Sequence, residues 1–202
     1  PVKPAQKPPH PLWLVAAASY KWKHINVMAI YKDKIVVVDL EATCWQNHQV
    51  PQGQQSEIIE VGICLLDGDS LQISDKRSLY VKPQQSQVST FCTGLTGITQ
   101  QLLDEDGMSL ATVCSILERD YNTRNRLWAS WGSYDRHMFM RQCKERKVRY
   151  PFARKHCNVK RAVKDTMKQR LPFAEILDLT GLGMVGRQHS GADDAYNTAR
   201  LL

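Results

Sequence analysis

Hydrophobic residues along the chain form two kinds of pattern. The aliphatic run over residues 35–38 is β-branched at every position, so it predicts a central strand that is covered on both faces. Further apolar runs predict strands over residues 57–66, 77–82 and 127–130. Apolar residues at helical spacing predict helices over residues 100–120, 134–147, 159–169, 173–180 and 191–202. Because strands come first and helices alternate with strands later, the order predicts an α/β fold, a mixed sheet flanked by helices.

Length and composition are typical of one folded domain. The chain has 202 residues, of which 43% are hydrophobic, enough to bury a full core. We expect this domain to span residues 31–202 and residues 1–30 to form a flexible or loosely packed extension. The extension is rich in proline and includes the apolar stretch 12–18, which is too short to cross a bilayer. That stretch could also be the core of a signal peptide, but a proline-rich start is unusual there, and we expect no membrane partner.

The six cysteines indicate the redox environment. They show no C-x-x-C pair and no zinc-ligand spacing, and they are scattered through apolar or helical stretches. Such cysteines are typical of reduced thiols in a core, so we expect a cytoplasmic protein.

Two acids end the first predicted strand. Asp39 and Glu41 follow the aliphatic run, where a turn residue is more usual. Side chains two apart on a strand point the same way, so both carboxylates can converge on one ion. Without a cation between them they would repel and raise each other's pKa. Hard oxygen ligands favour Mg²⁺ or Mn²⁺ over zinc. Taken alone, however, the pair is more simply interpreted as the start of a solvated loop.

A histidine and two acids lie where the last predicted helix begins. Ser190 is a candidate N-cap, which places His189 just before the helix and Asp193 and Asp194 in its opening turns. Periodicity does not choose between the two acids. In the simpler interpretation, both only interact favourably with the helix dipole.

Two further segments join the two acidic ones to give four motifs. The motifs are DLEATC at 39–44, FCTGLTGIT at 91–99, WGSYD at 131–135 and HSGADD at 189–194. In this order they resemble the DEDDh family of 3'-to-5' exonucleases, which have a ribonuclease H-like fold. The match is closest to the Eri-like and KapD-like branch and runs from about residue 33 to the C-terminus. Each motif alone is weak, but four in the same order are a strong signal.

The resemblance implies a role for each acid and for the histidine. Asp39, Glu41, Asp135 and Asp194 would hold two divalent cations, Mg²⁺ or Mn²⁺, with Asp135 acting through water. His189 would be the general base that takes a proton from the attacking water. The family's His-x-x-x-x-Asp spacing selects Asp194 over its neighbour.

The resemblance also places two segments around the 3'-terminal nucleotide. One segment is residues 42–43 and the other residues 95–97, where Gly97 would let the backbone approach the terminal sugar closely. Alternatively, Leu95 and Ile98 simply start a helix and pack into the core. The candidate substrate-binding residues are Ala42, Thr43, Leu95, Thr96, Gly97 and Trp131.

Basic residues are concentrated in one stretch. Residues 136–170 contain thirteen Lys or Arg and two acids, a formal charge of +11, whereas the whole chain carries +7. A basic region beside an acidic centre suits a polyanion held by its phosphates, so Lys160, Arg161 and Lys164 are candidate phosphate contacts. The alternative is a solvated helical face.

The sequence therefore predicts a metal-dependent exonuclease that removes 3'-terminal nucleotides from single-stranded RNA as 5'-monophosphates. DNA is a second candidate substrate. One alternative is an enzyme that trims or proofreads DNA, because the ligand set is shared. Another is a non-catalytic nucleic-acid-binding module, which would have lost a metal ligand or the histidine, and none is lost. The sequence does not indicate the oligomeric state.

Overall fold

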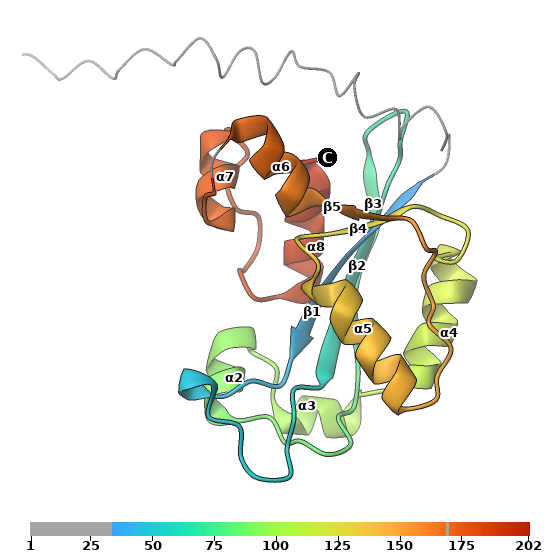
Figure 1. Ribbon diagram of the computed structural model, residues 1–202, viewed down its shortest axis with the longest axis vertical. Helices are drawn as coiled ribbons and strands as arrows, with labels where there is room; N and C mark the ends of the chain where they lie inside the picture. Colours follow the sequence, from blue (N-terminus) through green and yellow to red (C-terminus); the bar gives the residue numbers. More distant parts are fainter. Residues whose placement is uncertain (1–33, 169) are drawn as a thin grey trace, which may run out of the picture.

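The computed structural model describes residues 34–168 and 170–202, so the extension expected over residues 1–30 lies outside the described part. A five-stranded sheet forms its centre, in the order β3-β2-β1-β4-β5 (Figure 1). β2 pairs antiparallel with β1 on one side and with β3 on the other, whereas β4 and β5 continue the sheet in parallel with β1. The strands are β1 (Ile35–Ala42), β2 (Ile58–Leu66), β3 (Ile73–Tyr80), β4 (Trp128–Ser130) and β5 (His156–Asn158).

Helices cover both faces of the sheet and the end at which β1 finishes (Figure 1). α4 and α5 pack on one face and α6, α7 and α8 on the other, while α2 and α3 lie at the end of β1. Among the described helices, none is long and apolar enough to cross a membrane. The helices are η1 (Gln46–His48), α2 (Thr90–Thr96), α3 (Gln100–Glu105), α4 (Leu110–Tyr121), α5 (Tyr134–Glu145), α6 (Val159–Met167), α7 (Phe173–Leu179) and α8 (Gly191–Arg200).

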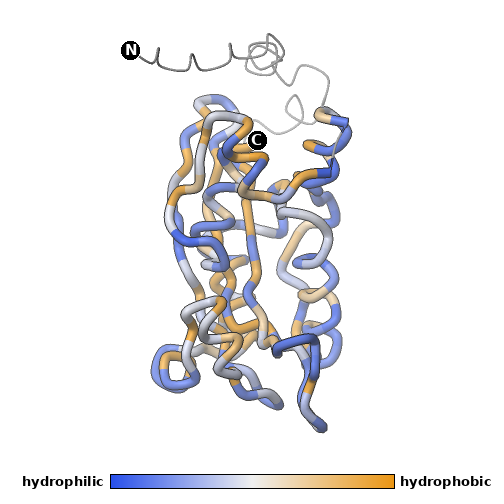
Figure 2. Tube along the Cα trace, turned by 90° about the vertical axis from the view of Figure 1, so that its left-hand side faces the viewer, coloured by the Kyte–Doolittle hydropathy of each residue, from blue (hydrophilic) through white to orange (hydrophobic). Residues whose placement is uncertain are grey.

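β1 divides its side chains between two hydrophobic cores. Even-numbered residues from Val36 pack against α4 and α5, and odd-numbered residues from Ile35 pack against α6, α7 and α8. Figure 2 shows the hydrophobic segments gathered along the central strands. Because side chains alternate along a strand, Asp39 and Glu41 continue the odd-numbered set and point toward the α8 side. The expected mixed sheet flanked by helices is therefore confirmed.

β1 and β3 are longer than the sequence pattern predicts. Both acids lie inside β1, because Asp39 pairs with Gly62 and Glu41 pairs with Glu60 on β2. Strand pairing with β2 thus continues the strand beyond its aliphatic run. β3 begins at Ile73 rather than at residue 77, although its first residues are polar and mostly exposed, because β2 pairs with them as well.

The single helix predicted over residues 100–120 is wrong, since α3 and α4 are separate. Between them, the backbone of Met108 donates to Tyr80 O at 3.0 Å and accepts from Lys82 N at 2.8 Å, so this residue extends the sheet. Ser109 then caps α4 by accepting from Thr112 N at 3.0 Å. Two short elements, α2 and β5, were not predicted as regular structure, because each is too short to show a period.

All six cysteines lie in the described part and are free thiols. Four are buried, and Cys44 and Cys157 are partly exposed. The expectation of packed, reduced thiols agrees with this arrangement.

α8 rests on β2 at a glycine. A Cβ atom on Gly62 would overlap the backbone of Gly191 and Ala192, the first two residues of α8. The missing side chain therefore sets how closely α8, which carries Asp194, approaches the sheet.

A carboxylate of β2 caps the same end of α8. Glu60 accepts hydrogen bonds from Gly191 N at 3.0 Å and from Ala192 N at 3.4 Å. Ser190 occupies the N-cap position, as predicted, but its side chain makes no capping hydrogen bond. The start of α8 is thus fixed by a residue that is distant in sequence.

The close approach of α8 predicts that Gly62→Ala is destabilising. The added methyl group must push α8 away from the sheet, so we expect the free energy of unfolding to fall by about 1 to 3 kcal/mol. Urea unfolding followed by circular dichroism measures this. Gly94→Ala in α2 is the matched control, because its Cβ would meet nothing within 4 Å, and it should stabilise the helix by up to about 1 kcal/mol. Wild-type stability of Gly62→Ala would contradict this packing.

Candidate active site

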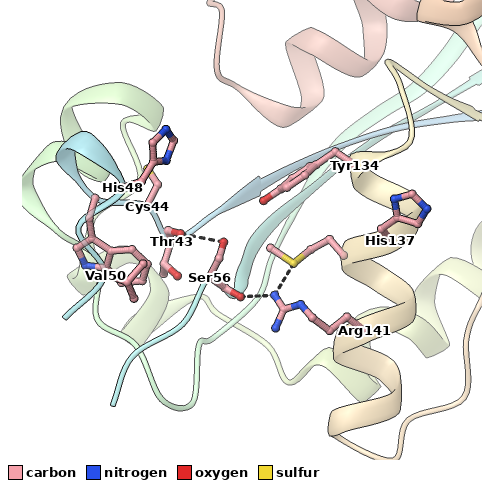
Figure 3. Close-up of a pocket in the computed structure, with 10 residues that line it drawn as sticks. Thr43, Cys44, His48, Val50, Ser56, Tyr134, His137 and Arg141 are labelled. Atoms are coloured by element: carbon pink, nitrogen blue, oxygen red, sulfur yellow. Dashed lines mark hydrogen bonds between the residues drawn. The ribbon is translucent and has the colours of Figure 1, made fainter. Parts of the chain in front are cut away.

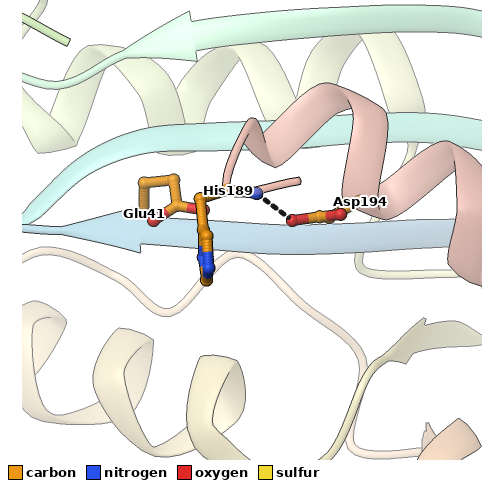
Figure 4. Close-up of side chains that lie close together, drawn as sticks. All are labelled: Glu41, His189 and Asp194. Atoms are coloured by element: carbon orange, nitrogen blue, oxygen red, sulfur yellow. Dashed lines mark hydrogen bonds between the residues drawn. The ribbon is translucent and has the colours of Figure 1, made fainter. Parts of the chain in front are cut away.

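Three side chains from two distant parts of the sequence meet beside the end of β1. Glu41 comes from β1, His189 from the loop before α8, and Asp194 from the first turn of α8. Their candidate ligand atoms all lie within 4.8 Å of one another (Figure 4). His189 N donates to Asp194 Oδ2 at 2.8 Å, whereas Asp194 Oδ1 is buried and has no hydrogen-bond partner among the described residues. A buried carboxylate oxygen left without a donor suits a metal ligand.

Asp39 and Asp135 complete the group of acids. Asp135 is buried in the first turn of α5, which begins soon after β4. Since β4 is parallel to β1, the carboxyl ends of both strands lie at the same edge of the sheet. Asp135 Oδ1 accepts a hydrogen bond from Leu40 N at 3.0 Å, at the residue between Asp39 and Glu41. The structure therefore brings all four predicted acids and the predicted histidine together.

Burial raises the pKa of each of the four acids, and repulsion from neighbouring carboxylates adds to the rise for Asp39, Glu41 and Asp194. For Glu41, burial and the neighbouring Glu60 and Asp194 carboxylates raise the pKa to about 8. Burial raises the pKa of Asp135 and of Asp194 to about 6, although hydrogen bonds from backbone N–H groups oppose both shifts. Burial, followed by repulsion from Asp135, raises the pKa of Asp39 well above its usual range. A cation among these groups would favour their ionised forms.

Two charged residues near the site were not predicted from the sequence. Glu60 adds a fifth carboxylate, which is buried and lies directly opposite Glu41 in the sheet. Arg187 supplies a positive charge that opposes the rise in the pKa of Glu41. Neither residue lies in a recognised motif, so only strand pairing and loop geometry reveal them.

An aromatic wall borders the acids. A pocket of about 210 Å³ contains Asp39, Glu41, His189 and Asp194 in its lining. Trp131, a predicted substrate-binding residue, also lines it, with its ring centroid 4.7 Å from that of Phe173 on α7. Phe173 and Gln188 line the pocket as well but were not predicted, because both lie outside the four motifs.

A larger pocket of about 520 Å³ lies between the segment after β1 and α5 (Figure 3). Figure 3 shows Thr43 and His48 on one side and Tyr134 and Arg141 on the other. Tyr134 is exposed and directly precedes Asp135, so this pocket adjoins the acidic site. Arg141 Nη2 donates to Ser56 O at 2.5 Å, which fixes the guanidinium at the pocket wall.

The predicted substrate-binding residues at the end of β1 and directly after it are buried. Ala42 and Thr43 are buried. The Thr43 hydroxyl donates to Gln55 O at 3.1 Å and accepts from Glu57 N at 2.9 Å. The Thr43 side chain therefore holds the segment after β1 to the backbone that leads into β2, and it also lines the larger pocket.

The predicted residues of α2 differ in accessibility. Leu95 is 36% exposed, whereas Ile98 is 3% exposed, so the interpretation of both as core residues fails for Leu95. Thr96 is buried, and its hydroxyl donates to Cys92 O at 2.9 Å. Gly97 ends α2 with φ of 71° in the left-handed region.

The predicted phosphate contacts lie on one exposed face of α6. Lys160, Arg161 and Lys164 are exposed, while Val159 and Val163 of the same helix are buried. Arg161 lies 3.8 Å from an exposed acid one helical turn later, a contact worth little in solvent. The three cations are thus accessible, and their role stays a prediction.

Known proteins are similar to this chain in sequence and in fold. The family model of RNase T-type exonucleases matches residues 36–202. The 3'-5' exoribonuclease 1 of Rattus norvegicus is 34% identical over 190 residues, which cover 89% of this chain and 54% of that protein. This chain thus spans about half the length of that relative.

Two solved structures extend the comparison. The nuclease domain of 3'hExo, a DEDDh family member bound to rAMP, is 31% identical with a TM-score of 0.73, covering 85% of this chain and 90% of that one. A 3'-exonuclease described by its 3'-end specific recognition of a histone mRNA stem-loop is 31% identical with a TM-score of 0.72, covering 85% of this chain and 80% of that one.

The fold and the site define a ribonuclease H-like nuclease domain of the DEDDh class. Within that class, this chain belongs to the RNase T-type exonuclease family, which confirms the resemblance carried by the four motifs. DEDDh exonucleases depend on divalent metal ions. The oxygen-rich ligand set and the unpaired Asp194 Oδ1 fit such ions.

The raised pKa of Glu41 predicts how the metal-free protein responds to pH. Folded Glu41 keeps its proton up to about pH 8, whereas the unfolded side chain releases it near pH 4. The folded state therefore loses stability as pH rises, and we expect the free energy of unfolding in EDTA to fall by about 1 to 2 kcal/mol between pH 6.5 and 8. Urea unfolding at several pH values measures this.

Two comparisons isolate the contribution of Glu41. Glu41→Gln should show a flatter dependence on pH, while Glu175→Gln on the exposed side of α7 should follow the wild type. Saturating Mn²⁺ should remove the loss, because metal ions bind ionised carboxylates. Identical pH dependence in wild type and Glu41→Gln would contradict this interpretation of the acidic cluster.

Proposed function

We propose that this chain hydrolyses the 3'-terminal phosphodiester of single-stranded RNA and releases nucleoside 5'-monophosphates, with two Mg²⁺ or Mn²⁺ ions as cofactors. The observation that carries the proposal is the convergence of Glu41, His189 and Asp194 within 4.8 Å, with one oxygen of Asp194 left without a donor. A non-catalytic binding module would not need this costly cluster of buried acids.

The side chains divide the chemistry among them. Asp39, Glu41 and Asp194 would hold the divalent ions on the α8 side of β1, and Asp135 would contribute from α5. When bound, the ions supply Lewis acidity that stabilises charge on the phosphate and lowers the pKa of water. His189 accepts the proton of the attacking water as general base.

Recognition of a 3' end is assigned to the surfaces beside the acids. The larger pocket with Tyr134, the aromatic wall at Trp131 and exposed Leu95 offer apolar area on which bases can stack. Stacking contributes roughly 1 to 3 kcal/mol per base and tolerates any base. We therefore expect weak sequence preference.

RNA is the proposed substrate because of the relatives. The rat relative is named an exoribonuclease, and the two similar structures are described with rAMP and with an mRNA stem-loop. DNA stays the second candidate, since the same ligand set serves DNA-trimming exonucleases.

The function predicts a specific product pattern. With 5'-labelled RNA and Mn²⁺, the protein should give a ladder that shortens from the 3' end. With 3'-labelled RNA, the first labelled product should be a mononucleotide, and DNA should be cut more slowly. Asp39→Asn should be inactive, whereas Asp69→Asn in the exposed turn between β2 and β3 should be fully active. Internal cleavage, 5' shortening or full activity in excess EDTA would overturn the proposal.

The exposed face of α6 predicts the salt dependence of binding. Binding to a polyanion weakens as salt rises, so a plot of log affinity against log salt has a negative slope. If Lys160, Arg161 and Lys164 contact phosphates, this slope should become shallower in the triple alanine variant, by about 0.7 per lost contact. Fluorescence anisotropy with single-stranded RNA, in Ca²⁺ to slow hydrolysis, measures the slope. An unchanged slope would mean that these residues are only a solvated face.

A further inference from the structure

Arg187 joins the loop before α8 to the end of α2. Its Nη2 donates a hydrogen bond to the carbonyl oxygen of Thr96, the last residue of α2. The two residues are 91 positions apart in sequence, so the contact joins segments that come together only on folding. Arg187 itself lies two residues before His189.

Gly97 makes room for this contact. A Cβ atom at residue 97 would overlap the guanidinium group of Arg187. Gly97 also has φ of 71°, a conformation that other residues adopt only with strain. The space beside Gly97, which the sequence assigned to the terminal sugar, is therefore taken up by Arg187 on this side.

The loop that carries His189 is held at several points. Arg187 N donates to Asp193 Oδ2 at 2.8 Å, and the same carboxylate pairs with Lys76 of β3. His189 N donates to Asp194 Oδ2 at 2.8 Å. His189 has φ of 61°, which a non-glycine residue keeps only when its surroundings fix it. The Arg187 side chain adds a contact with α2, an element that is separate from both the loop and α8.

We propose that Arg187 is a positioning residue that holds the His189 loop against α2, so that the general base keeps a fixed distance and orientation relative to the end of α2, where exposed Leu95 is assigned to the 3' end. The proposal rests on the proposed function of the site. A planar guanidinium can lie along the backbone of Gly97 and donate to Thr96 at the same time, which a lysine ammonium cannot reproduce. Misplacing a reacting group by about 1 Å can cost on the order of 100-fold in rate.

A double-mutant cycle between Arg187 and His189 tests this directly. Rates and KM are measured on 5'-labelled single-stranded RNA for wild type, Arg187→Ala, His189→Ala and the double variant. Arg187→Ala should lower kcat by about 10- to 100-fold and change KM by less than about threefold. His189→Ala should lose about 100- to 10,000-fold. In the His189→Ala background, removing Arg187 should cost less than about threefold, because its effect passes through the histidine.

Two further variants complete the design. Arg187→Lys keeps the charge and should stay impaired, while Arg119→Ala, which removes an exposed arginine from α4, should match the wild type. Circular dichroism and urea midpoints equal to those of the wild type show that each variant is folded.

Each contrary result has a distinct meaning. An equal loss from Arg187→Ala in both backgrounds, a rise confined to KM, or full recovery in Arg187→Lys would make Arg187 a phosphate contact or a simple charge and overturn the proposal. Normal activity of Arg187→Ala would overturn it as well. Wild-type protein without activity on any oligonucleotide would instead overturn the proposed function.

Discussion

Like charges must be held together beside the end of β1, and this electrostatic repulsion constrains the rest of the structure. Five carboxylates approach one another there, and no ion pair recorded among the described residues joins any of them to a Lys or Arg side chain. Backbone N–H groups compensate in part, from Leu40 to Asp135 and from His189 to Asp194. Such hydrogen bonds favour the ionised forms but do not cancel burial, so the site as folded is suited to cations. The five acids are Asp39, Glu41, Glu60, Asp135 and Asp194.

The two hydrophobic cores stabilise this arrangement from both sides of the sheet. β1 packs against α4 and α5 on one face and against α6, α7 and α8 on the other, so the strand cannot shift to relieve repulsion at its end. The contact of α8 with Gly62 and the capping of α8 by Glu60 fix the second set of ligands relative to the first. The geometry of the site is thus determined by packing, and its unfavourable electrostatics are offset by apolar burial elsewhere.

Much of the fold and the central acids could be predicted from the sequence. The aliphatic run of β1 indicates a buried strand, and each of the four motifs is a continuous run of residues. Other features depend on contacts between distant segments. The break between α3 and α4 arises because Met108 pairs with the sheet, which no helical period reveals. Glu60 and Phe173 come near the site through strand pairing and helix packing, and Arg187 reaches α2 through a loop conformation. These are tertiary effects that a local pattern cannot contain.

We expect the acids to form a binding site for two divalent ions. A titration of the metal-free protein with Mn²⁺, followed by electron paramagnetic resonance, tests this without substrate. Two ions should bind per chain and give a spin-coupled signal, because ions in such sites lie about 4 Å apart. Asp194→Asn should bind the ions more weakly and lose the coupling. Binding of fewer than two ions, or two uncoupled ions that Asp194→Asn leaves unchanged, would contradict it.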